Sequence, residues 1–430
     1  MFKSVLSLTL AAALGTASFG QTTLTAIPGE AAAAKYASIS QEILRAIEKG
    51  NEYLKSKQNP EGYWAQPSYP ALTALAVTAY MRDPANQGKP VPEYIRKGYD
   101  FILKSQKEDG SIFNRGMSSY NTAVCMMALL AANKEEYAPA ILKGRAYLIK
   151  QQNHFAPDNP YNGGIGYGDK QAPPIADLSN TSLALEAIYY SQKLAKDGKY
   201  GEQPDLDWNA ATEFINRCQQ NPAVNKEPWV SNDKSQLGGF VYRPGVSSAR
   251  DKKSAAFDKA EPPKAYGSMT YAGMQSLIYA NVDKNDPRVK LALKWLENSY
   301  SLDENPGMGV QGLYYYYQAM SKALSAMGID TLTLENGRKV DWRDELANKL
   351  ISIQKSDGSW VNTNNRWWEA DPVLVTSYCV LALEQLYHSL SGEKRIGRGT
   401  LAACREQMLA DGYAARTANL RISAANSLLS

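Results

Sequence analysis

The chain has few of the residues that several common site chemistries require. In 430 residues it has only 2 histidines, 4 cysteines and 8 phenylalanines. Its 47 basic and 43 acidic residues leave a net charge of +4, and no run of lysine and arginine concentrates the excess. We therefore expect no nucleic-acid partner, because such proteins carry a basic patch. We also expect neither a metal nor a cofactor, since two histidines leave little material for a ligand set.

The four cysteines are too few for a disulfide framework in a chain of this length. Cys125 and Cys379 lie inside strongly apolar helical runs, where a buried free thiol is the usual state. Cys218 and Cys404 complete the set. We expect the thiols to stay free.

Long apolar runs are also missing, apart from a short one at the N-terminus. Lys3 gives a positive start, residues 5–14 form the apolar run, and small residues precede Gln21. The run is too short to cross a bilayer, and no later stretch is long enough to be a transmembrane segment. We expect residues 1–20 to be a cleaved signal peptide, followed by a flexible leader at 21–35. The mature protein would then be exported, to the periplasm or beyond the cell, with peripheral membrane contact left open.

What the chain does have is a recurring loop. Residues 58–64 read Gln-Asn-Pro-Glu-Gly-Tyr-Trp, 106–112 read Gln-Lys-Glu-Asp-Gly-Ser-Ile, and 354–360 read Gln-Lys-Ser-Asp-Gly-Ser-Trp. Each copy follows one helical pattern and precedes another, and its glycine supplies the positive φ of a tight reversal. A repeat of this kind predicts an array of helix pairs.

The two helices of each pair differ in pattern. In the first pair, residues 40–57 carry apolar residues on one face, whereas residues 71–80 are apolar nearly all round and must be buried on every side. This alternation recurs six times. The outer helices are expected at 40–57, 94–104, 138–151, 208–219, 289–299 and 341–353. The inner helices are expected at 71–80, 123–132, 183–192, 269–280, 313–327 and 373–386.

Six such pairs predict an all-α fold, an (α/α)6 toroid over residues 36–390 with inner helices inside a ring of outer ones. An open solenoid would leave the apolar helices half exposed, which is costly. The proline-rich stretch 221–265 interrupts the pattern as a long loop insertion, and 391–430 form a C-terminal tail with helical sequence at its end.

The recurring loop resembles the QW motif of squalene–hopene and oxidosqualene cyclases, and the repeats of protein prenyltransferase β subunits. The resemblance covers about residues 36–390 and implies the same α/α barrel. It also implies that Gln58, Trp64, Gln354 and Trp360 are structural residues that tie adjacent helix pairs together. Segments 267–273 and 367–372 are similar to an exported bacterial subgroup of these repeat proteins.

The resemblance directs attention to one catalytic group. Cyclases open an inner helix with Asp-x-Asp-Asp-Thr, whose middle aspartate protonates an alkene or epoxide. Here residues 177–181 read Asp-Leu-Ser-Asn-Thr, so only Asp177 remains and Ser179 and Asn180 replace the next two acids. Because protonating an alkene needs a strong, positioned acid, hopene-type cyclisation is not expected. Asp177 and Ser179 are equally suited to capping a helix.

The prenyltransferase branch would need zinc held by Asp, Cys and His. His388 lies nine residues from Cys379, about half a helical turn out of phase, so the two face opposite sides of a helix. His154 lies in a polar connection. Zinc is therefore not expected.

The remaining candidates lie where the inner helices begin, because unpaired N–H groups and helix dipoles converge there and favour negative charge. Glu369 and Asp371 form an acid cluster there, and in an extended segment both would point the same way. With Asp177, they are the candidate catalytic residues. The candidate cavity-binding residues are Asn121, Ser179, Asn180, Thr270, Tyr271, Gln311, Tyr314, Trp367 and Trp368.

Three functions follow as hypotheses, and they leave open whether the chain is an enzyme. The first is an exported, terpenoid-cyclase-like protein that binds an isoprenoid or other apolar ligand in the barrel. The second is a carbohydrate-active hydrolase or lyase with a glycan ligand, by analogy of fold and acid pair alone. The third is a non-catalytic binding or scaffold protein.

Overall fold

The structure is a computed structural model, which describes residues 28–168, 175–249 and 262–391. In these ranges twelve α-helices, three short 3-10 helices (Pro84–Asn86, Glu135–Tyr137 and Arg366–Trp368) and one two-stranded sheet make up the regular structure, so the prediction of a mainly helical chain is confirmed. The odd-numbered helices are α1 (Pro28–Ser56), α3 (Glu93–Lys104), α5 (Ala138–Lys150), α7 (Trp208–Cys218), α9 (Pro287–Asn298) and α11 (Trp342–Ser352). The even-numbered helices are α2 (Pro70–Arg82), α4 (Ser118–Ala132), α6 (Leu178–Lys196), α8 (Gly267–Tyr279), α10 (Leu313–Met327) and α12 (Pro372–Leu390).

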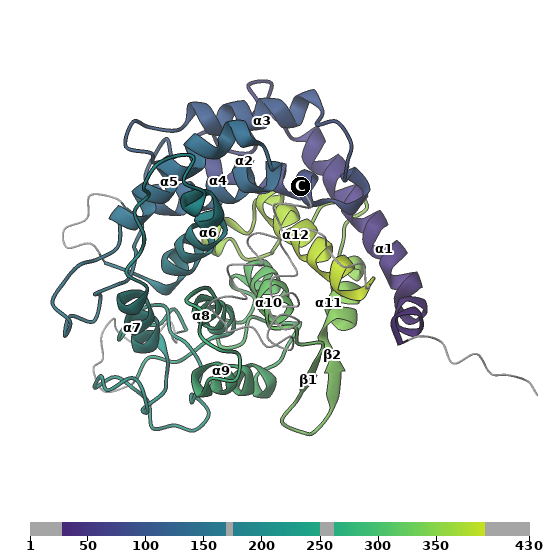
Figure 1. Cartoon of the computed structure of the whole chain (residues 1–430). Coiled ribbons are helices and arrows are strands. Elements are labelled where there is room, and N and C mark those ends of the chain that lie inside the picture. The colour runs from purple at the N-terminus through teal and green to yellow at the C-terminus, as the bar shows by residue number, and fades with distance from the viewer. Residues whose placement is uncertain (1–27, 169–174, 250–261, 392–430) are drawn as a thin grey trace, which may run out of the picture.

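The even-numbered helices pack in a closed circuit. Each one contacts the next along the chain, and α12 returns to contact α2. The odd-numbered helices lie around the outside, and α1 packs against α11 and α12 (Figure 1). Residues 70–79 of α2 are buried on every side, whereas α3 buries one face only. The predicted alternation of outer and inner helices is therefore present in the described chain.

Two features depart from the prediction. Helix α1 begins at Pro28, inside the predicted leader at 21–35. A short antiparallel hairpin, β1 (Thr331–Thr333) with β2 (Lys339–Asp341), precedes α11. Between α7 and α8 the described residues form turns and isolated bridges, as expected of a long loop. The predicted signal peptide and residues 392–430 of the predicted tail lie outside the described residues.

A glutamine side chain joins neighbouring helix pairs in five loops. Gln58 Nε2 donates to the Gly62 carbonyl of its own loop and to the Tyr94 carbonyl at the start of the next outer helix, at 2.9 and 2.7 Å. The same two kinds of bond are made by Gln106, Gln152, Gln219 and Gln354. Gln354 bonds to the Ala46 carbonyl of α1 at 3.0 Å, so the last pair is fastened to the first.

The end of each of these loops is anchored to the inner helix that follows. The Trp64 N–H donates to Thr73 Oγ1 at 3.0 Å, and its indole Nε1 donates back to the Leu54 carbonyl of α1. Equivalent backbone bonds reach the hydroxyls of Thr122, Thr181, Thr270 and Thr376. One loop therefore fixes both helices of its own pair as well as the next outer helix.

We predict that Gly358→Ala destabilises the protein more than Gly337→Ala. Both glycines have a positive φ, +87° and +80°, so alanine is strained at either position. Only at Gly358 would the new Cβ lie 2.4 Å from a backbone oxygen, that of Lys49 in α1, whereas at Gly337 nothing lies within 4 Å. In urea unfolding, Gly358→Ala is expected to lower the free energy of unfolding by ~1–3 kcal/mol more than Gly337→Ala does. Equal losses would contradict a tight closure of the last loop onto α1.

Candidate functional site

The space enclosed by the inner helices, which we call the lumen, is the strongest candidate for a binding site. On α10, Tyr315, Gln318 and Lys322 are half-buried and recur at helical spacing. Two contacts identify this stripe as the inward face, since the Tyr315 hydroxyl lies close to Ser179 of α6 and Lys322 forms an ion pair with Glu186 of α6. In the circuit, α8 lies between α6 and α10. These side chains therefore meet across the interior of the circuit.

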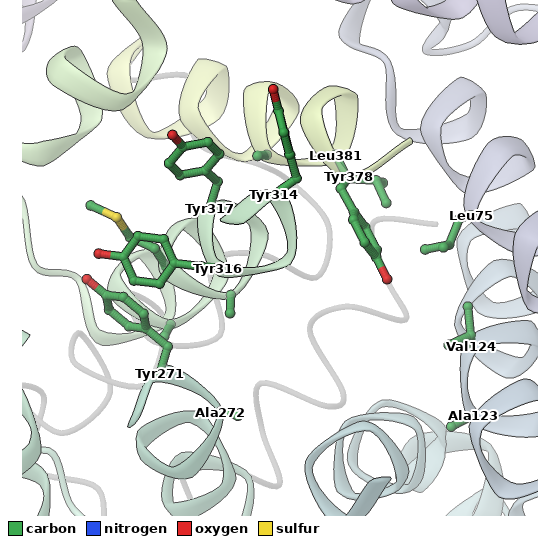
Figure 2. Packing of buried hydrophobic residues seen from close by; sticks show 14 of the residues in the cluster. Leu75, Ala123, Val124, Tyr271, Ala272, Tyr314, Tyr316, Tyr317, Tyr378 and Leu381 are labelled. Carbon is green, nitrogen blue, oxygen red and sulfur yellow. The ribbon is translucent and has the colours of Figure 1, made fainter. Parts of the chain in front are cut away.

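The opposite wall of the lumen is apolar. Leu75 of α2 and Val124 of α4 each keep 8% of their surface accessible, although neighbours in both helices are completely buried. Figure 2 shows Leu75, Val124 and Tyr378 pointing toward the same central space. The inward positions of α2, α4 and α12 supply Leu72, Leu75, Val124, Met127 and Leu381. The lumen therefore has an apolar side and a polar side.

Four hydroxyl groups from four helices meet at the end of the lumen where the inner helices begin, which we call the mouth. The hydroxyls of Tyr120 of α4 and Tyr378 of α12 lie close enough to act on each other, as do those of Ser179 of α6 and Tyr315 of α10. The rings of Tyr315 and Tyr378 lie 6.1 Å apart, so the two pairs adjoin. Burial raises the pKa of Tyr120 and of Tyr315 to about 12, so both phenols stay neutral. We call these four residues the hydroxyl cluster.

Groups from the protein itself occupy the helix N-termini at the mouth. The Asn121 side-chain oxygen accepts from the Ala71 N–H at the start of α2, at 3.0 Å. Asn305 accepts from the Ser268 N–H at the start of α8, at 2.9 Å. The expectation that unpaired N–H groups attract an anion is therefore wrong at these helices. Asn121 is a cap between two helices rather than a residue that lines the lumen.

Glu369 is the corresponding cap of α10. Its carboxylate is 1% exposed and accepts from the Tyr315 N–H at 2.8 Å, the Tyr314 N–H at 3.4 Å and Asn362 Nδ2 at 2.6 Å. Burial raises its pKa, and the hydrogen bonds act against that shift. A helix N-terminus thus holds the carboxylate that we predicted as a catalytic candidate.

The predicted parallel pair of carboxylates is replaced by two separate caps. Asp371 caps α12 by accepting from the Val373 N–H at 2.8 Å, while Glu369 caps α10. Glu369 does not share an extended segment with Asp371, because Glu369 is in the right-handed helical region (φ −69°, ψ −1°) at the end of a 3-10 turn, and only Asp371 is extended. The prediction of an extended segment is therefore wrong.

The two tryptophans form the rim of the mouth. Trp367 and Trp368 are 45% and 40% exposed. The Arg366 guanidinium lies 4.4 Å from the Trp367 ring and donates to Gln311, and Trp368 packs against Tyr69 with ring centroids 4.7 Å apart. A cleft of about 390 Å³ opens beside them, lined by Gln66, Leu72, Asn365, Trp368, Ala370 and Asp371. Because Leu72 also belongs to the apolar wall, the cleft adjoins the lumen.

Asp177 lies behind the lumen wall, at the N-cap of α6. It accepts from the Asn180 N–H at 2.9 Å and from Asn180 Nδ2 at 2.8 Å, and Tyr242 is a further hydrogen-bond partner. Burial raises its pKa to about 6. Asp177 and Asn180 thus bind each other, while Ser179 faces the lumen. The position that matches the cyclase acid therefore presents a hydroxyl to the lumen.

Three other predicted residues lie away from the lumen. Thr270 is one of the loop anchors, and Tyr271 packs between helices with its ring 5.5 Å from that of Tyr316. The Tyr314 hydroxyl donates to the Val361 carbonyl at 3.2 Å. Successive residues of a helix point about 100° apart, so within the run 314–317 only Tyr315 is directed inward.

Sequence reasoning missed several of the residues that line the lumen. Glu186 and Lys322 were not predicted, although a charged residue on an inner helix that is otherwise apolar marks a polar site facing inward. Tyr120 and Tyr378 were also missed, because no sequence pattern shows that α4 and α12 meet. Asn305 was missed because its cap acts on a helix 37 residues earlier in the chain.

Three further properties bear on the chemistry. Within the described ranges no group of three or more His, Cys, Asp or Glu side chains is placed to hold a metal ion. None of the helices described there has the length and apolar character to cross a membrane. Cys125, Cys218 and Cys379 are free and buried, and burial raises the pKa of each thiol.

Among known proteins, no family model matches the chain. Solved structures of the type II terpene cyclase MstE from Scytonema resemble it at 10% sequence identity, over 82% of this chain and 99% of that one. The TM-score is 0.48 for MstE with geranylgeranyl dihydroxybenzoate as substrate and 0.47 with merosterolic acid A as product. A protein from Actinoplanes matches at 12% identity, with coverage of 81% and 99% and a TM-score of 0.46. Similarity at this level assigns no ligand or reaction to this chain.

We predict that Asp177→Asn changes how stability depends on pH. The pKa of Asp177 is about 6 in the folded chain, against an ordinary value of 3.8 that applies when the chain is unfolded, so between these values the folded state holds the extra proton. The stability contributed by this group therefore falls as pH rises from about 4 to above 6. Asparagine caps equally well but does not titrate. The free energy of unfolding of the variant, measured with urea and taken relative to that of the wild type, should rise by about 2–3 kcal/mol between pH 4 and pH 7.5. A difference that stays constant with pH would contradict the burial of this carboxyl.

Proposed function

We propose that this chain is an (α/α)6 toroid that binds an elongated apolar ligand of the isoprenoid type in its lumen. The observation that carries the proposal is the apolar wall formed by Leu72, Leu75, Val124 and Met127, whose inward side chains keep accessible surface inside the ring. A hydrocarbon chain against this wall would gain about 0.8 kcal/mol for each buried CH₂ group, before the entropic costs of binding.

The cleft at the rim supports this proposal as a route for the ligand. Trp367 and Trp368 expose large apolar rings beside the cleft, and Leu72 connects the cleft to the apolar wall. Exposed aromatic rings at the opening of an apolar site favour the approach of an apolar molecule. The pattern of the first 20 residues further supports export, which would place this binding site outside the cytoplasm.

The chemistry that we propose excludes cyclisation started by protonation. The only acid retained from the cyclase motif is Asp177, which is held by Asn180 and Tyr242 behind the wall. The groups that do face the mouth are serine and tyrosine hydroxyls, which are far too weakly acidic to protonate an alkene. We therefore propose binding of the ligand without the hopene-type reaction.

Hydrolysis of a glycan is not favoured by the same geometry. A retaining or inverting glycosidase needs two carboxyl groups free to act on a bond between them. Glu369 is held by the first turn of α10 and Asp371 by that of α12. If the wild type binds no isoprenoid, a purely structural role without ligand binding is favoured instead.

We predict that Val124→Trp abolishes or strongly weakens ligand binding, whereas Val224→Trp does not. The first substitution puts an indole into the lumen, and the second puts the same side chain on an exposed loop position. Binding would be measured by native mass spectrometry after incubation with a C20 isoprenoid alcohol, and folding by far-UV circular dichroism. Met127→Trp provides a second lumen variant in case Val124→Trp does not fold. Equal binding by folded lumen and surface variants, or no binding by the wild type, would overturn the proposed function.

A further inference from the structure

We propose that the hydroxyl cluster binds an uncharged hydrogen-bonding head group of the ligand, a hydroxyl or a carbonyl. The ligand class is then a neutral isoprenoid alcohol or ketone, rather than a pure hydrocarbon or an isoprenoid diphosphate. This inference rests on the proposed function, because it concerns the polar end of the same lumen.

The cluster and the apolar wall share helix faces, so one elongated molecule can reach both. Val124 follows Tyr120 by four residues on α4, and Leu381 follows Tyr378 by three on α12, so each apolar side chain lies one turn below a hydroxyl. Tyr120, Ser179 and Tyr315 all belong to the first turn of their helices, which places the cluster at the mouth. A head group at the cluster would leave its apolar chain pointing along the wall.

The four hydroxyls of the cluster can serve a ligand as well as one another. Each hydroxyl offers one hydrogen and two lone pairs. When one hydroxyl of a pair donates to the other, the receiving hydroxyl keeps a hydrogen of its own. A hydroxyl ligand can accept this hydrogen and donate to a remaining lone pair, while a carbonyl can only accept. A hydrocarbon that excludes water from the cluster would leave these groups unsatisfied, which costs binding free energy.

The charges around the cluster disfavour an anionic head group. The carboxylate of Glu369 bonds to the Tyr315 N–H, and the carboxyls of Asp177 and Glu186 also lie close enough to act on the Tyr315 hydroxyl. Lys322, the lysine on the inward face of α10, is already paired with Glu186, and Arg366 at the rim lies over Trp367 and donates to Gln311. The helix N-terminus at this point is occupied by Glu369. A diphosphate would therefore meet negative charge and find its usual N–H donors in use.

The test compares three C20 probes that share one chain: geranylgeraniol, the hydrocarbon without its hydroxyl, and geranylgeranyl diphosphate. The variants are Tyr315→Phe and Ser179→Ala, which remove one hydroxyl each and keep the side-chain shape. Tyr317→Phe is the matched control, because its hydroxyl donates to the Leu302 carbonyl outside the lumen. Dissociation constants for each probe would be measured by isothermal titration calorimetry on the full-length mature chain.

We expect the wild type to bind the alcohol about tenfold more tightly than the hydrocarbon, the value of roughly one net hydrogen bond. The diphosphate should bind more weakly than the alcohol. In Tyr315→Phe and Ser179→Ala the preference for the alcohol should fall severalfold, with hydrocarbon binding kept, whereas Tyr317→Phe should keep the wild-type preference.

Three outcomes would overturn the inference, and only the third also overturns the proposed function. If the wild type binds alcohol and hydrocarbon equally, and Tyr315→Phe changes neither, the lumen binds lipid but the cluster does not select a head group. If the diphosphate binds most tightly, the ligand class is anionic. If no probe binds and Val124→Trp behaves like the wild type, the proposed function fails together with the inference.

Discussion

A glutamine amide that donates to two backbone carbonyls sets the spacing between neighbouring helix pairs, and the rest of the structure depends on it. One carbonyl belongs to the glutamine's own loop and the other to the next outer helix. Every such bridge therefore fixes the position of one helix pair relative to the next. The bridge from Gln354 to Ala46 connects the last helix pair to the first. A closed circuit of six helices, each about 10 Å across, leaves a central space about one helix wide. The lumen is thus the interior of the circuit in which the six inner helices contact one another.

The residues that fill this central space decide what the ring can bind. The inner helices begin at one end, where their N–H groups would otherwise attract an anion. Asn121, Asn305 and Glu369 satisfy several of these groups from neighbouring segments. Anion binding is therefore replaced by internal capping, and the hydroxyls of Tyr120, Ser179, Tyr315 and Tyr378 are left facing the lumen. The apolar wall and these neutral hydroxyls together suit an amphiphilic molecule without charge.

The sequence predicted what depends on local pattern and failed where distant segments meet. Periodicity located all twelve helices, and the loops at 58, 106 and 354 were recognised from Gln, Gly and their spacing. Gln152 and Gln219 make the same bridges, but insertions of different length separate them from the residues that complete their loops. Ser179 was predicted as a cavity residue from its place in the cyclase motif, and the structure brings its side chain close to Tyr315 of α10. Glu369 was assigned to catalysis because its partner, the start of α10, lies more than 50 residues earlier.

Photo-crosslinking tests the central claim, that the ligand lies inside the ring, most directly. The mature protein would be irradiated with a C20 isoprenoid alcohol that carries a diazirine at its apolar end, and the labelled peptides would be mapped by mass spectrometry. The account predicts labels on the inward positions of α2 and α4, among them Leu75, Val124 and Met127. Excess unlabelled alcohol should suppress them. Labels confined to the exposed rim at Trp367 and Trp368, or to the outer helices, would contradict it.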